Sequence, residues 1–136
     1  MSQTKLNKPS ESAPLTVFQY TRAQAIEDGV LVDLTELARE SGFKVPVACT
    51  AAVWNGYVVP TQRTRALGQS ERGRARNMLH TLFNAVRKDG SGDAVTFQVM
   101  FLQTPDRRVM VKLKALFGPD DRGEPAVTVM LPGEDF

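Results

Sequence analysis

The sequence has few of the residues that most often carry chemistry: one cysteine, one histidine and one tryptophan among 136 residues. A single cysteine, Cys49, excludes an intramolecular disulfide and fits a reducing cytoplasm. One Cys and one His cannot supply the four nitrogen or sulfur ligands of a structural zinc site. We therefore expect a cytoplasmic protein with no metal and no cofactor.

Long apolar runs are also missing. No stretch approaches the roughly 18 apolar residues that a membrane-spanning helix needs. The first residues, MSQTKLNKPSESAP, include two lysines but no apolar segment behind them, so they do not form a secretory signal. The sequence thus predicts a soluble protein without a membrane partner.

Catalytic motifs are absent as well. The sequence contains no phosphate-binding glycine loop of the GxxxxGK[ST] or GxGxxG type and no GxSxG nucleophile elbow. Cys49 lies among small apolar residues, where it is expected to act as a buried hydrophobe, and His80 falls on the polar side of a predicted helix. The acidic turn at 120–124 lacks the alternating ligands of a calcium loop, so its carboxylates are expected to be solvated rather than to bind a cation. We predict that the protein is not an enzyme.

The apolar fraction of 42% is sufficient for a core, and a chain of this length favours one domain, which we place at residues 15–136. Residues 1–14 are polar and offer too little apolar surface to offset the entropy of ordering, so they are expected to form a disordered tail. A short strand is a candidate at 15–20.

The strongest helical signal is SERGRARNMLHTLFNAVRKDG, which predicts an amphipathic helix over 70–89. Ser70 can cap its N-terminus and Gly90 can close it. Its apolar stripe consists of Ala75, Met78, Leu79, Leu82, Phe83 and Val86.

Shorter elements are expected before this helix. Thr21 and Gln24 form a capping-box pattern at the start of a short helix that Gly29 ends, and a strand is a candidate at 30–34. A second short helix runs over TELARES and is closed by Gly42. Residues 50–58 fit either a helix or a strand, and 61–69 form a polar connection.

After Gly90 the apolar period changes from 3.6 to 2. Residues 94–103 and 107–117 alternate and are joined by a tight turn, which indicates a β-hairpin, and 126–131 form a third strand. The fold class is therefore α+β. Its C-terminal part is a three-stranded antiparallel meander that strand 30–34 could extend, covered by helix 70–89 and the short N-terminal helices.

Two runs resemble the ends of a known family. TRAQAIEDGVLVDLTELARESGFKVPVACTAAVW and KALFGPDDRGEPAVTVMLPGED are similar to the opening and the close of small uncharacterised bacterial proteins, often carried on plasmids, phages and integrative elements. The resemblance implies a cytoplasmic bacterial protein in a mobile-element context. It implies no reaction and no catalytic residue.

The net charge is only +2, but it is unevenly distributed. Residues 62–88 carry seven basic side chains and one acid, a net charge of +6, which leaves −4 for the rest. We expect this basic segment, 63–88, to contact nucleic-acid phosphates, helped by the positive end of the helix dipole. The candidate binding residues are Arg63, Arg65, Arg72, Arg74 and Arg76, with Lys112 and Lys114 on the open face of the meander.

Three alternatives stay open. The arginines can pair with the acidic flanks and form a solvated surface. The protein can be a binding module of the anti-defence type that occupies a host protein surface, using Met100 and Met110 as adaptable apolar contacts. It can also form a homodimer through the open face or an unpaired edge strand.

Overall fold

A computed structural model of the protein describes residues 20–89 and 92–135. The expected tail at 1–14, most of the candidate strand at 15–20, and the closing residue Gly90 lie outside the described residues. In chain order the elements are α1 (Arg22–Glu27), β1 (Leu31–Asp33), α2 (Thr35–Ser41), β2 (Val47–Thr50), α3 (Ala51–Val53), the π-helix η1 (Trp54–Val58), α4 (Gln62–Arg65), α5 (Glu71–Asp89), β3 (Ala94–Thr104), β4 (Arg107–Pro119) and β5 (Pro125–Met130).

The sheet has five strands in the order β1-β2-β5-β4-β3, so the α+β class is confirmed. Strands β3, β4 and β5 form the expected antiparallel meander. The sheet does not stop there, because β2 pairs parallel with β5 and β1 pairs antiparallel with β2. The prediction of a three-stranded meander was therefore incomplete. It missed β2, whose four residues are all buried and so show no alternation.

The predicted helix ends are confirmed where the structure describes them. The Thr21 side chain accepts a hydrogen bond from the Gln24 N–H and the Gln24 side chain accepts from the Thr21 N–H, which completes the capping box. Gly42 ends α2 with φ of 113°. The Ser70 hydroxyl oxygen accepts from the Gly73 N–H at 3.0 Å, so Ser70 caps α5.

Residues 50–65 are more helical than the sequence indicated. Of the two alternatives for 50–58, helix or strand, the structure shows a helix. The Thr50 hydroxyl oxygen accepts a hydrogen bond from the Val53 N–H at 3.3 Å and caps α3, and the π-helix η1 follows α3 directly. The predicted polar connection at 61–69 contains α4, which is capped by Thr61.

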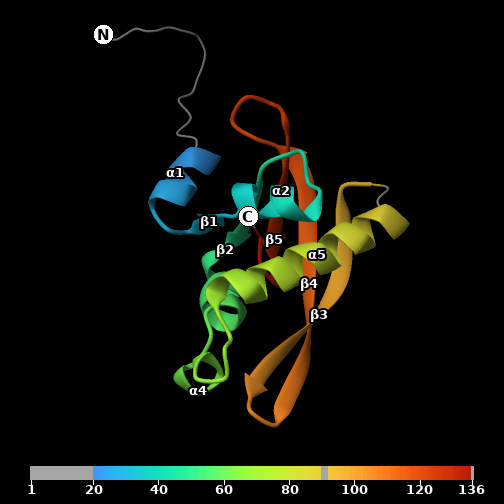
Figure 1. The fold of residues 1–136 in the computed structure, drawn as a ribbon. Coiled ribbons are helices and arrows are strands. Elements are labelled where there is room, and N and C mark those ends of the chain that lie inside the picture. The colour runs from blue at the N-terminus through green and yellow to red at the C-terminus, as the bar shows by residue number, and fades with distance from the viewer. Residues whose placement is uncertain (1–19, 90–91, 136) are drawn as a thin grey trace, which may run out of the picture.

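Helix α5 crosses one face of the sheet, as Figure 1 shows. Its buried residues, which include Met78, Leu79 and Leu82, pack in one core cluster with Phe97 and Val99 of β3. A second, smaller cluster unites Ala25 of α1 with Leu31 and Ala48. Ala48 points away from the neighbouring Val47 and Cys49, which belong to the main cluster, so α1 covers the opposite face of the sheet.

Candidate nucleic-acid interface

The predicted basic residues near the start of α5 gather at one end of the molecule. Arg63 and Arg65 are exposed on α4, and α4 contacts β3 near the turn between β3 and β4. Figure 1 shows α4 and this turn beside each other at the lower end of the molecule. Residues that are some forty positions apart in the sequence therefore share one surface.

Arg72 and Arg76 lie on α5 and share one carboxylate. A nitrogen of Arg72 is 2.6 Å from Glu40 Oε2, and a nitrogen of Arg76 is 3.4 Å from Glu40 Oε1. The alternative that pairs arginines with acidic residues thus holds in part for these two. Exposed ion pairs contribute little free energy, and two cations against one anion still leave a net positive charge.

Arg74 lies elsewhere than predicted, because its side chain is only 7% exposed. Its Nε and Nη2 both donate to the Tyr57 carbonyl at 2.9 and 2.7 Å. Its Nη1 donates to the Leu102 carbonyl at 2.8 Å and to Gln69 Oε1 at 3.0 Å. The guanidinium also lies 5.0 Å from the centre of the Phe101 ring. Arg74 therefore joins η1, α5 and β3, and it does not belong to the exposed surface predicted for these arginines.

The burial of Arg74 has an electrostatic consequence. Burial lowers the pKa of its guanidinium from the ordinary value. An arginine nevertheless keeps its proton in a protein, and no carboxylate of the described residues lies within 4 Å of this one. A buried positive charge thus lies beneath the exposed arginines.

Two further arginines, Arg107 and Arg108, were not among the predicted contact residues. Strand β5 reaches only as far as the pair Lys114–Met130, so the rest of β4 pairs with β3 alone and ends in the turn that carries both arginines. Both are exposed. The hairpin prediction placed them at a turn, but only the fold brings the hairpin into contact with α4. We call the exposed set the basic end: Arg63, Arg65, Arg72, Arg76, Arg107 and Arg108.

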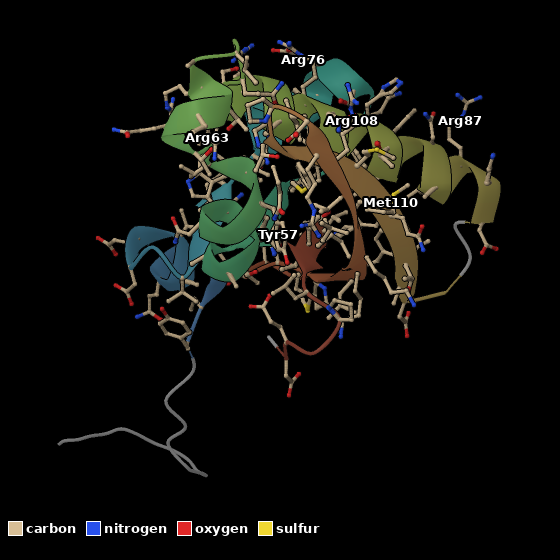
Figure 2. The ribbon with its side chains drawn as sticks, turned by 90° about the horizontal axis from the view of Figure 1, so that it is seen from below. Tyr57, Arg63, Arg76, Arg87, Arg108 and Met110 are labelled. Carbon is tan, nitrogen blue, oxygen red and sulfur yellow. The ribbon has the colours of Figure 1, made fainter. Side chains whose placement is uncertain are left out.

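Figure 2 looks onto this region and shows Arg63, Arg76 and Arg108 around it, with Arg87 further along α5. In residues 20–89 and 92–135, no carboxylate lies within 4 Å of Arg63, Arg65, Arg107 or Arg108. Arg87 and Lys88 are in the last turn of α5. At 1.5 Å per residue they are roughly 17 Å or more beyond Arg76, so the predicted segment 63–88 divides between two places.

The two lysines predicted as contact residues differ in their exposure. Lys112 is exposed on the outer face of the hairpin. Lys114 is half-buried, and its Nζ donates to the carbonyls of Pro132 and Glu134 at 3.5 and 3.3 Å. Met100 and Met110 pair in register on the outer face and are 46% and 55% exposed. Arg108 precedes Met110 by two residues and shares this face, so the face combines apolar surface with two exposed cations, Lys112 and Arg108.

A hollow of about 330 Å³ separates the hairpin from the start of α5. Its lining includes Ser70, Gly73, Arg74, Asn77 and Arg108, and no acidic residue. The basic end thus contains a concave feature with cationic walls.

The other two residues considered for a chemical role are Cys49 and His80, and neither belongs to a catalytic arrangement among the described residues. Cys49 is fully buried, and burial with the nearby Glu134 carboxylate raises the pKa of its thiol to about 12, so it is a neutral thiol. His80 is exposed on α5. Among the residues that the structure describes, no three His, Cys, Asp or Glu side chains group as a metal site requires.

None of the described helices has the length and apolar character to cross a membrane.

Fold and site together define an α+β protein with a five-stranded mixed sheet and a cluster of arginines at one end. The chain matches the model of the Family of unknown function (DUF6573) over residues 11–135, and it belongs to that family. This agrees with the resemblance to an uncharacterised family. No curated protein and no solved structure matches the chain.

Proposed function

We propose that this protein is a non-enzymatic accessory protein of a bacterial mobile element that binds nucleic acid through its basic end. The observation that supports the proposal is the convergence of exposed arginines from α4, α5 and the β3–β4 turn. Four of them have no carboxylate within 4 Å in the described part of the chain. Unpaired arginines on a rigid surface favour phosphate contact.

The shape of the hairpin supports the same proposal. From Leu113 to Arg107, β4 has only β3 as a partner. Seven residues at about 3.3 Å each make this two-stranded part roughly 23 Å long. Its inner face is buried in the core at Phe101 and Val111, so only the tip that carries Arg107 and Arg108 is open to a partner. The major groove of DNA is about 12 Å wide and about 8.5 Å deep and admits a two-stranded ribbon. Arg107 and Arg108 at the tip would then meet phosphates or base edges, while Arg63 and Arg65 contact the backbone beside the groove.

The cellular context in the proposal has separate support. The resemblance of the two end runs of the chain to small proteins of plasmids, phages and integrative elements supports a mobile-element origin and a cytoplasmic location. A bacterial cytoplasm contains nucleic acid at high concentration, so the context and the basic end are consistent with each other.

A protein partner is the second candidate, and the exposed pair Met100 and Met110 favours it. Adjacent exposed methionines offer an apolar contact that adapts to its partner. The partner would be a host protein or a second copy of the chain. A dimer in solution that Met100→Ser/Met110→Ser dissociates would favour the second copy over nucleic acid.

The test compares two triple variants in titrations with DNA and RNA at about 50 and 200 mM salt. Arg63→Ala/Arg65→Ala/Arg107→Ala removes three charges from the basic end. The matched control Lys44→Ala/Arg87→Ala/Lys88→Ala removes three exposed charges elsewhere. We expect the first variant to bind weakly and its salt slope to fall by roughly 2–3 from the wild-type value, because each phosphate contact contributes about 0.9.

The control should keep most of the affinity and most of the slope. Absence of wild-type binding at the lower salt would contradict the proposal. Equal losses of affinity in the two triple variants would also contradict it. The arginines of the basic end would then contribute no more to binding than exposed cations elsewhere on the protein.

A further inference from the structure

Two arginines contribute to the hollow at the basic end. Arg108 approaches it from β4 and Arg74 from α5. All its other lining residues are uncharged. The lining of the hollow therefore carries two positive charges and no negative charge, which favours an anionic ligand.

Arg74 is held rigidly beneath this hollow. Four of its five N–H groups donate to Tyr57, Gln69 and Leu102, and the fifth has no acceptor in residues 20–89 and 92–135. The guanidinium cannot change position without breaking these bonds. A ligand that reached it would meet a cation whose orientation costs no further entropy.

Neutral donors complete the lining. The Ser70 oxygen accepts from the Gly73 N–H, which leaves the hydroxyl proton free to donate. Asn77 Nδ2 has two N–H groups and uses one on the Met100 carbonyl at 3.2 Å. At Gly73 a Cβ would lie 3.1 Å from the Ser70 oxygen, so a side chain at this position would crowd the Ser70 hydroxyl.

We propose that the hollow binds the terminal phosphate of a nucleic-acid strand. This assignment rests on the proposed function for the source of the phosphate. A terminal phosphomonoester carries a charge close to −2 at pH 7, which matches the two arginines, whereas an internal phosphodiester carries −1. A recessed site also admits the end of a strand more readily than its continuous backbone, and Arg74, at 7% exposed, is recessed.

The experiment measures the affinity of the full chain for one single-stranded oligonucleotide in three forms: with a 5′-phosphate, with a 3′-phosphate and with neither. We expect one phosphorylated form to bind about tenfold more tightly than the unphosphorylated form. Arg108→Ala should abolish this preference. Arg107→Ala is the matched control, since Arg107 is in the same turn but does not line the hollow, and it should keep the preference. Thermal melting checks that both variants remain folded.

The outcomes separate this proposal from the proposed function. If all three forms bind with equal affinity, the hollow is not a terminal-phosphate site, although nucleic-acid binding stands. If none binds, the proposed function fails, and the assignment to a nucleic-acid end fails with it. Tighter binding of a phosphoserine peptide than of any oligonucleotide would also overturn that assignment and would point to a phosphoprotein.

Discussion

Strand β4 joins two turns of opposite charge. The turn before it contains Asp106 and leads directly into Arg107 and Arg108, the first residues of the strand, which gives a net charge of +1. The turn after it contains Asp120, Asp121, Arg122 and Glu124, which gives a net charge of −2. Figure 1 shows these turns at opposite ends of the sheet. The comparison between them indicates which charges of this protein maintain the fold and which are left for a partner.

At the acidic turn, the carboxylates of Asp120 and Asp121 accept hydrogen bonds from backbone N–H groups. Asp120 Oδ1 accepts the N–H groups of Arg122 and Glu124, each at 2.9 Å. The Asp121 carboxylate accepts from the N–H groups of Arg22 and Ala23 at 2.7 and 3.0 Å, so it caps α1 from a distant part of the chain. The carboxylates of this turn were expected to be solvated, but Asp120 stabilises the turn itself and Asp121 caps the start of α1.

At the basic end most cations have no such function. Arg74 is the exception, since its guanidinium joins three elements through backbone carbonyls. The exposed arginines around it contact few groups of the protein, and Glu40 is the carboxylate that two of them share. Charge that is not used for stability is available for binding, and this difference is the basis of the proposed function.

The largest effect that we predict for a single substitution is at Arg74. Arg74→Met keeps much of the side-chain volume but leaves the Tyr57 and Leu102 carbonyls without their donor. We expect the free energy of unfolding to fall by about 3 kcal/mol, because buried polar groups without partners are costly. Urea denaturation monitored by circular dichroism measures the loss.

Arg76→Met is the control for this substitution. Arg76 is exposed and makes one long ion pair, so its replacement should change the free energy of unfolding by less than about 0.5 kcal/mol. Equal costs at both positions would remove the distinction between a structural arginine and a free one, and Arg74 would return to the contact surface.

A smaller effect, dependent on pH, is predicted at Asp120. Hydrogen bonds from the Arg122 and Glu124 N–H groups lower the pKa of its carboxyl in the folded protein. The ionised form therefore stabilises the fold above the unfolded pKa of about 3.9, and this stabilisation is lost as the pH falls through the lower folded pKa. Asp120→Asn should reduce stability at pH 6 and should approach wild type at pH 2, as thermal melts across this range would show.

Glu124→Gln provides the comparison within the same turn. The backbone of Glu124 is hydrogen-bonded, but no hydrogen bond or ion pair of its carboxylate occurs among the described residues. The melting temperature of the Glu124→Gln variant should therefore equal that of wild type at every pH. If Asp120→Asn behaved in the same way, the acidic turn would be solvated, as the sequence suggested.

The sequence could predict elements whose signals are local. The Thr21–Gln24 capping box, Gly42 and the Ser70 cap each depend on a few neighbouring residues, and the β3–β4 hairpin follows from its alternation. Strand β2 could not be found in this way. Its parallel pairing with β5 joins residues about 80 positions apart, and its burial on both sides removes the period.

The basic end was predicted only in part, for similar reasons. The helical period did contain the signal for Arg74, because Arg74, Met78 and Leu82 recur at intervals of four and share one face of α5. Counting all arginines as surface charge obscured it. The contribution of Arg107 and Arg108 could not be inferred, because it depends on the path of α5 across the sheet.

The most direct test of the account is to titrate isotope-labelled protein with a short DNA duplex and to follow the backbone amide signals by NMR. The account predicts that the largest changes occur at Arg63, Arg65, Arg107 and Arg108, that they weaken as salt is raised, and that residues 120–124 stay unchanged. Changes confined to the acidic turn or to the face around Met100 and Met110, or no changes at low salt, would contradict it.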